Sequence, residues 1–161
     1  MLHWLPAALH RTLLRLAQRV RLRAWALLQI EVRGCHVLAF DPAGRVLLVR
    51  HSYHEPERWM LPGGGLSRGE DPATSGAREV AEETGCVLES ACWIGTDLRL
   101  MPGGWRNRVE LVTGRASGVP CPDGREIAEA AFFGLDALPA NTGTTVHSSL
   151  ACWRDWRASK G

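Results

Sequence analysis

The sequence lacks several features that would point directly to a class of protein. None of its five cysteines forms a Cys-x-x-Cys pair and their number is odd, so neither a zinc site nor a complete disulfide framework is indicated. We therefore expect reduced thiols and a cytoplasmic protein. Nine prolines and 17 glycines are spread along 161 residues, which excludes collagen-like and linker compositions. No run of about 20 apolar residues occurs, so we expect no transmembrane span.

Charge is nearly balanced overall but unevenly placed. The chain has 19 Lys+Arg against 17 Asp+Glu, and a net charge of +2 is too small to argue for a nucleic-acid partner. Residues 1–30 contain five arginines and no acidic residue, which leaves 14 − 17 = −3 for the remainder. Because 45% of the residues are apolar, the chain can bury the core of one ordinary domain.

A basic amphipathic helix is predicted within residues 1–30. Apolar residues recur at i, i+4, i+7 and i+11 from Leu9 to Val20, and arginines recur every fourth residue from Arg11 to Arg19. The leading interpretation is a helix docked on the domain with its arginines in solvent. Contact with nucleic acid or an anionic membrane is one alternative, and an organelle transit peptide is another, although the segment is poor in serine.

Residues 31–161 have the pattern of one α/β domain with a mixed sheet. Asp-Pro-Ala-Gly at 41–44 is turn chemistry between two strand-like runs and predicts a hairpin. Asp71 as N-cap and Pro72 at the first helical position begin a helix that Gly85 ends. We expect strands over residues 35–40, 45–50, 87–98, 108–116 and 130–133, and helices over 72–84 and 145–156. We expect core positions for four tryptophans in apolar stretches, namely Trp59, Trp93, Trp153 and Trp156.

Three carboxylates share one face of the first of these helices. Glu79, Glu82 and Glu83 stand at i, i+3 and i+4. Arg78 lies beside them, and Glu70 lies in the loop just before the helix. Like charges at this spacing repel by roughly 0.2–0.5 kcal/mol per pair. A solvated face would carry more compensating Lys or Arg, so the cluster indicates a bound divalent cation such as Mg²⁺ or Mn²⁺.

The segment that ends at Cys86 resembles the Nudix box, G-x5-E-x7-R-E-U-x-E-E-x-G-U, in which U is a bulky aliphatic residue. The fixed positions are matched by Gly64, Glu70, Arg78, Glu79, Glu82, Glu83 and Gly85. One position departs from the pattern, because the last U is Cys86, a small apolar residue. The likeness covers about residues 34–156 and implies a Nudix-like α/β/α sandwich with a mixed sheet. We therefore divide the chain into a basic helical segment, 1–30, and a Nudix hydrolase domain, 31–161.

The resemblance implies a magnesium site built from the box and the loop before it. Glu82 and Glu83 would be metal ligands, joined by the backbone carbonyl of Gly63 or Gly64. The glycines up to Gly65 would let the backbone approach the metal and the phosphates without a Cβ in the way. Mg²⁺ is the expected cofactor, with Mn²⁺ as a substitute.

The same resemblance implies which residues handle the attacking water. Glu79, oriented by Arg78, would be a metal ligand or the general base. Glu70 would orient a ligand through a hydrogen bond rather than bind the metal itself. Some Nudix enzymes take the base or an extra ligand from a loop farther along the chain, and Glu126 is the first candidate here. Glu129 and Glu110 are the reserve candidates.

Candidate substrate contacts come from a loop and from the end of a strand. Trp105 lies in a polar loop with Arg106 and Arg108, where a tryptophan could stack on a nucleobase and arginines could hold a phosphate. An ordinary exposed turn is the alternative for this loop. His51 and Tyr53 follow the second strand and could line the same pocket, although histidines at such positions are more often surface residues.

The resemblance implies a Mg²⁺-dependent hydrolase that cleaves the pyrophosphate bond of a nucleoside diphosphate linked to another moiety. A diphosphate repels a nucleophile, so divalent ions must neutralise its oxygens and supply hydroxide from bound water. ADP-ribose, a sugar nucleotide and a nucleoside triphosphate are the expected substrates. The alternatives are a non-hydrolytic nucleotide sensor whose basic helix binds nucleic acid or a membrane, and a prenyl diphosphate isomerase. Many relatives are dimers, so a homodimer remains open.

Overall fold

The computed structural model describes residues 20, 24, 31–53, 55–102, 104–122 and 124–161. Of the basic N-terminal segment it includes Val20 and Ala24, which have helical backbone, and the side chain of Val20 is 61% exposed. The rest of the predicted basic helix lies outside the described residues, so its docking on the domain stays a prediction. Within the described part of the chain, no helix is long and apolar enough to cross a bilayer.

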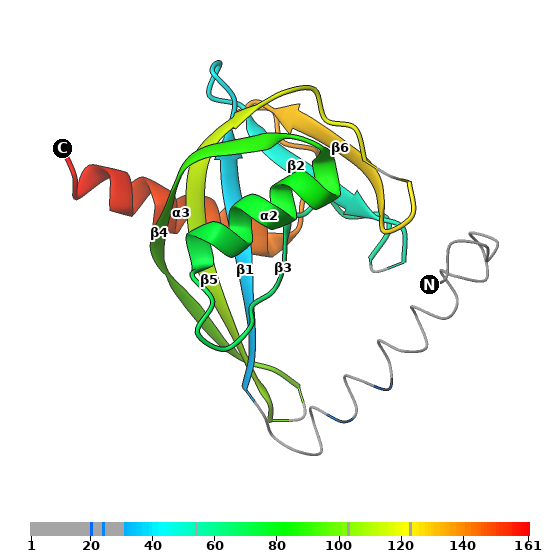
Figure 1. The fold of residues 1–161 in the computed structure, drawn as a ribbon, viewed down its shortest axis with the longest axis vertical. Coiled ribbons are helices and arrows are strands. Elements are labelled where there is room, and N and C mark those ends of the chain that lie inside the picture. The colour runs from blue at the N-terminus through cyan, green and yellow to red at the C-terminus, as the bar shows by residue number, and fades with distance from the viewer. Residues whose placement is uncertain (1–19, 21–23, 25–30, 54, 103, 123) are drawn as a thin grey trace.

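A six-stranded mixed sheet forms the centre of the fold (Figure 1). Its strands are β1 (Glu31–Phe40), β2 (Val46–His51), β3 (Gly63–Gly65), β4 (Val87–Leu100), β5 (Arg106–Ser117) and β6 (Ile127–Phe133). The strand order is β4-β5-β1-β2-β6, and β3 pairs with β1 off this path. Strands β1 and β5 run parallel, whereas the other pairs are antiparallel.

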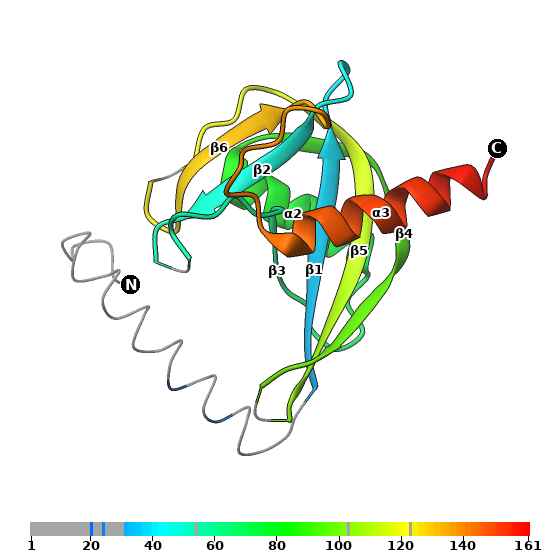
Figure 2. The same ribbon diagram turned by 180° about the vertical axis from the view of Figure 1, so that it is seen from behind.

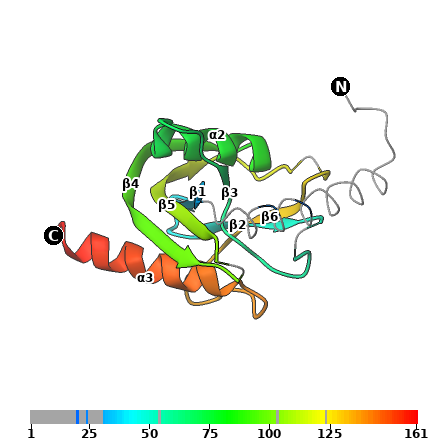
Figure 3. The same ribbon diagram turned by 90° about the horizontal axis from the view of Figure 1, so that it is seen from below.

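Two helices, α2 (Pro72–Thr84) and α3 (Thr144–Ala158), cover opposite faces of the sheet (Figures 2 and 3). Helix α2 begins as predicted, because the Asp71 side chain accepts a hydrogen bond from the Thr74 N–H at 2.8 Å. It ends at Gly85, which has φ 70°. The expected α/β/α sandwich with a mixed sheet is therefore confirmed.

Strand alternation divides the core into two layers. Val37 and Ala39 of β1 pack toward α2, whereas Leu38 between them packs toward α3. Helix α2 approaches the sheet closely at Gly76, where a Cβ would lie 2.9 Å from a methyl of Val37. The buried layers hold the glycine segment of β3 and the carboxylates of α2 in fixed relative positions.

Most elements expected from the sequence are present, and the differences have physical reasons. The glycine-rich stretch from Gly63 to Gly65 is a short strand rather than a loop, because pairing with β1 imposes an extended backbone that glycine does not favour. The expectation for Trp93 was wrong, since its side chain is 51% exposed on β4, while Trp153 is buried. All five cysteines are free in the structure.

Candidate active site

The glycine strand β3 leaves no room for side chains on the face turned toward its neighbours. A Cβ on Gly63 would lie 2.0 Å from the backbone carbonyl oxygen of Cys35 in β1. A Cβ on Gly64 would lie 2.5 Å from the carboxylate of Glu79 on α2. The glycines therefore bring the backbone of β3 into direct contact with the acidic face of the helix.

Glu83 is the most deeply placed carboxylate of the box. Its Oε2 accepts a hydrogen bond from the backbone N–H of Gly63 at 3.0 Å. Burial raises the pKa of Glu83 to about 8, although the hydrogen bond from Gly63 acts in the opposite direction. The negative charges of Glu79, Glu126 and Glu82 raise this pKa further. A negative charge on Glu83 therefore destabilises the protein unless a cation lies nearby.

Arg78 holds the other carboxylates of the box together. Its guanidinium lies 2.9 Å from Oε1 of Glu79, 3.3 Å from Oε1 of Glu70 and 3.5 Å from Oε2 of Glu82. Burial raises the pKa of Glu79 even though Arg78 opposes this effect. Glu70 is different, because a hydrogen bond from the Ser67 N–H, followed by Arg78, lowers its pKa. The expected pairing of Arg78 with Glu79 is present in the structure.

The chemistry of these residues fits a hard divalent cation. Three carboxylates, those of Glu70, Glu79 and Glu82, share a single guanidinium, and the charges of Glu79 and Glu82 also act on Glu83, so the cluster carries excess negative charge. Carboxylate and backbone carbonyl oxygens are the ligands that Mg²⁺ takes in proteins. In the conformations described, no three His, Cys, Asp or Glu side chains stand close enough together to enclose an ion. These residues fit a cation because their oxygens are suitable ligands. A cation would also offset the cost of burying the carboxylates and the repulsion between them.

Glu126 lies next to the box although it is far from it in the sequence. Strand β6 pairs with β2, with Ile127 opposite His51, and the Ser52 N–H donates to the backbone oxygen of Glu126 at 2.9 Å. The charge of Glu126 is one of those that raise the pKa of Glu83. The rings of His51 and Tyr53 lie 6.1 Å apart in an edge arrangement at the same end of β2. The structure thus places these candidate residues beside one another.

Comparison with known proteins decides the family. The NUDIX domain profile matches residues 31–153, which is most of the chain. This chain belongs to the Nudix family. The match contains the whole box and every strand and helix named above up to Trp153 of α3.

Individual relatives support the same family. The chain is 37% identical to an RNA pyrophosphohydrolase of Rhodospirillum rubrum over 71 residues, which is 41% of this chain and 42% of that protein. It is 30% identical to the NAD-capped RNA hydrolase NudC of Vibrio parahaemolyticus over 118 residues, 72% of this chain and 45% of that protein. The chain thus spans about half or less of the length of these curated relatives.

A solved structure shares the fold as well. The crystal structure of a MutT NUDIX hydrolase from Burkholderia pseudomallei is 26% identical with a TM-score of 0.65, covering 75% of this chain and 96% of that one. The solution structure of the E. coli ORF135 protein is 16% identical with a TM-score of 0.64, covering 80% and 92%, which shows the fold alone. The sandwich described above is therefore a known Nudix arrangement.

The loop expected to present an aromatic ring does not do so in this Nudix domain. Trp105 is only 6% exposed, and the turn between β4 and β5 is closed by a hydrogen bond from the Met101 N–H to the Trp105 oxygen. Arg108 donates to the carboxylate of Glu110 at 2.8 Å, and Arg106 is exposed opposite Glu31. These residues lie on β5, on the other side of β1 from β2 and β6, so they are separated from Glu126 and His51.

The structure shows a polar group beneath α3 that the sequence analysis missed. Arg99 of β4 pairs with Asp97 at 2.6 Å and donates to Oγ of Ser148 on α3 at 2.8 Å. Burial lowers the pKa of His36 to about 4, and the charges of Arg99 and His51 lower it further. The group therefore extends from α3 toward the end of β2. The only signal in the sequence is that Asp97 and Arg99 are two residues apart on one strand.

Substitution of Gly64 by alanine is expected to reduce the catalytic activity of this Nudix domain. The new Cβ would overlap the carboxylate of Glu79, which would have to move away from Arg78. We expect kcat to fall about tenfold to a hundredfold, the range seen when a supporting contact of a metal site is lost. Gly161→Ala is the control, because nothing lies within 4 Å of its added Cβ and it lies outside the box. Equal activities of the two variants, with intact folding, would contradict this role of Gly64.

Proposed function

We propose that this chain is a divalent-metal-dependent hydrolase that cleaves the pyrophosphate bond of a nucleoside diphosphate linked to another moiety. The observation that carries the proposal is the contact between the half-buried carboxylates of Glu79 and Glu83 on α2 and the glycine backbone of β3, including the hydrogen bond from Gly63 to Glu83. A purely structural helix has no need of several carboxylates directed at a glycine backbone. Residues 31–161 would form the hydrolase domain, with residues 1–30 outside it.

The proposed metal ligands are Glu82, Glu83, and the backbone carbonyl of Gly63 or Gly64, with Glu79 as a further ligand. Mg²⁺, when bound, would neutralise phosphoryl oxygens and lower the pKa of a water molecule. The glycine segment keeps this side of the site free of side chains, so that a diphosphate can approach the carboxylates.

Glu79 or Glu126 would accept the proton of the attacking water at a carboxylate oxygen. Burial already raises the pKa of Glu79, which makes it a better base near neutral pH than an exposed glutamate. Arg78 would hold Glu79 in position, and Glu70 would in turn hold Arg78. Glu126 lies close enough for its charge to act on Glu83, so it would face the same water or a second ion.

The substrate class is extended to RNA by the relatives. Two of them are named for hydrolysis of RNA, one as a pyrophosphohydrolase and one as acting on NAD-capped RNA. We therefore place RNA with a 5′ diphosphate or triphosphate beside ADP-ribose, sugar nucleotides and nucleoside triphosphates. In each of these substrates a pyrophosphate bond is attached to a nucleoside, so one carboxylate cluster would serve all of them.

The test is a comparison of kcat/KM for a 5′-triphosphorylated RNA, ADP-ribose and a nucleoside triphosphate, each with Mg²⁺. We expect one class to be preferred and its kcat to fall roughly 10³-fold in Glu82→Gln, because a metal ligand is lost. Glu89→Gln replaces an exposed glutamate of β4 and serves as the control. Near wild-type turnover in Glu82→Gln would remove Glu82 from the metal site.

A further inference from the structure

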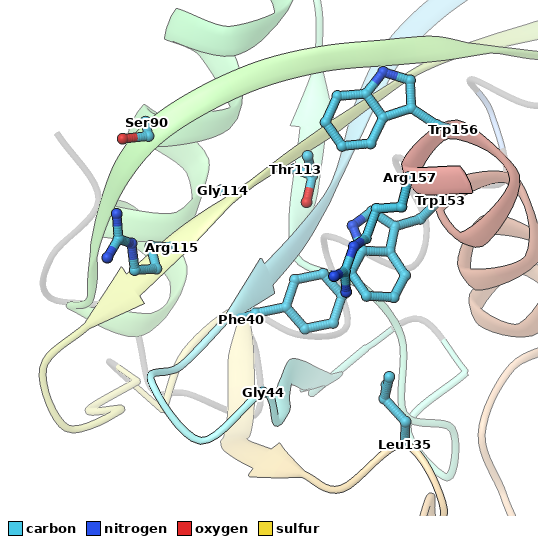
Figure 4. Close-up of a pocket in the computed structure, with 10 residues that line it drawn as sticks. All are labelled: Phe40, Gly44, Ser90, Thr113, Gly114, Arg115, Leu135, Trp153, Trp156 and Arg157. Carbon is cyan, nitrogen blue, oxygen red and sulfur yellow. The ribbon is translucent and has the colours of Figure 1, made fainter. Parts of the chain in front are cut away.

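A cavity lies under the C-terminal half of α3, away from the Nudix box (Figure 4). Its volume is about 610 Å³, within the range of small-molecule sites. It sits where β1 and β5 end, at Phe40 and Arg115, which are in register. The glycine strand pairs instead with residues 34–36 of β1, and the acidic helix covers the other face. The cavity is therefore separate from the candidate active site.

Aromatic rings form one wall of the cavity. The rings of Phe40 and Trp153 stack with their centroids 4.4 Å apart and an angle of 27° between their planes. Trp156, three residues farther along α3, is half-buried and borders the same space (Figure 4). Because Phe40 stacks on the Trp153 ring and Arg157 lies over it, a further planar ring would contact this wall at Trp156.

Two arginines give the cavity a positive charge. Arg157 places its guanidinium carbon 4.9 Å from the centroid of the Trp153 ring, and Arg115 lies on the other side of the cavity (Figure 4). Neither arginine makes an ion pair with any residue that the structure describes, and none of the described lining residues is acidic. Glu89 faces Arg115 across the β4–β5 pair without pairing with it. The two guanidinium groups are thus available to an anion.

The side of the cavity formed by β4 is irregular at Ser90. The pairing of β4 with β5 shifts register between Glu89 and Cys92, and Ser90 has φ 53°, a value that non-glycine residues seldom adopt. Ser90 borders the cavity on the same side as Arg115 (Figure 4). A hydroxyl beside a guanidinium is a suitable pair of donors for a phosphate oxygen.

We propose that this cavity binds a nucleotide, with its base against the aromatic wall and its phosphate between Arg115 and Arg157. The ring surface, the unpaired cationic groups and the volume together match a planar base joined to an anion. The nucleotide could be free or part of single-stranded RNA. Binding of RNA rests on the proposed function, whereas binding of a free nucleotide does not.

The experiment measures binding of two probes that lack a pyrophosphate bond, AMP and a short single-stranded RNA with a 5′ hydroxyl. Binding to the full chain is measured by isothermal titration calorimetry. A metal chelator is present, which suppresses metal-dependent binding at the box. We expect at least one probe to bind, and its affinity to fall at least about tenfold in the Arg115→Ala/Arg157→Ala double variant, because two charge-assisted contacts are lost.

Three further variants of this chain show whether a loss of binding comes from the cavity itself. Arg154→Ala removes an exposed arginine of α3 that does not line the cavity, and Trp156→Ala removes part of the aromatic wall. We expect Arg154→Ala to bind as the wild type does and Trp156→Ala to bind more weakly. Glu83→Gln should lose hydrolysis but keep binding, which separates this proposal from the proposed function. Binding of neither probe, or equal losses in Arg154→Ala and the double variant, would overturn the nucleotide site.

Discussion

Glu83→Gln is expected to stabilise the metal-free protein near pH 8 while it removes catalytic activity. In the folded chain, burial raises the pKa of Glu83 from its ordinary value of 4.5 to about 8. Because the folded carboxyl holds its proton more tightly than the unfolded one, wild-type stability falls as pH rises from about 4.5 to about 8. The loss at pH 8 is on the order of 3–4 kcal/mol. Glutamine cannot ionise, so the variant should avoid this loss.

Urea denaturation of both proteins in a chelator, at pH 5 and pH 8, measures this effect. The difference in the free energy of unfolding should be small at pH 5 and should grow toward pH 8 in favour of Glu83→Gln. Glu89→Gln, an exposed site, should show no such growth. Addition of Mg²⁺ should stabilise the wild type and leave Glu83→Gln nearly unchanged. If the difference in the free energy of unfolding between Glu83→Gln and the wild type does not depend on pH, the environment of Glu83 does not oppose its charge.

Glu110→Gln is expected to cause a large loss of stability at neutral pH. The carboxylate is only 3% exposed and accepts hydrogen bonds from Trp93 at 2.9 Å, Thr96 at 2.6 Å and Arg108 at 2.8 Å. Burial alone would raise the pKa of Glu110, but these hydrogen bonds outweigh it and lower the pKa to about 2. Loss of the charge leaves its donors imperfectly paired, so we expect a cost of roughly 2–4 kcal/mol in the free energy of unfolding.

The sign of the pH dependence is opposite to that of Glu83. Because the folded pKa of Glu110 is depressed from 4.5, its contribution is complete above about pH 4.5 and is lost as pH falls toward about 2. Glu129→Gln is the control, since Glu129 pairs with Arg50 but is 52% exposed, and should cost about 1 kcal/mol or less. Chemical denaturation at pH 7 measures the loss in the free energy of unfolding for Glu110→Gln and for Glu129→Gln. Equal small losses would mean that Glu110 contributes no more than a surface pair.

The features that the sequence predicted well depend on neighbouring residues. The hairpin turn follows from Asp41, whose side chain accepts hydrogen bonds from the N–H groups of Ala43 and Arg45. Helix α2 is bounded by Asp71 and Gly85, whose capping chemistry is local. The box positions were identified in the same way, because their spacing is fixed by the helix that carries them.

Features that depend on distant segments were not predictable. The polar sequence around Trp105 suggested exposure, but its side chain is buried. The apolar sequence around Trp93 suggested burial, but this residue lies on β4, an edge strand of the sheet, and is exposed. The closeness of Glu126 to Glu83 required the pairing of β6 with β2. The cavity that contains Arg115 likewise joins the ends of β1, β5 and α3, which are far apart in the sequence.

The most direct test of a metal-dependent pyrophosphatase is chromatographic analysis of the products from a 5′-triphosphorylated RNA, ADP-ribose and nucleoside triphosphates. The purified full chain is incubated with Mg²⁺, with Mn²⁺ and with a chelator, beside Glu83→Gln. We expect cleavage of a pyrophosphate bond in at least one substrate, dependent on metal and lower by roughly 10³-fold in Glu83→Gln. Cleavage that persists in chelator or in the variant, or no cleavage of any substrate with either metal, would contradict the assignment of the carboxylates on α2.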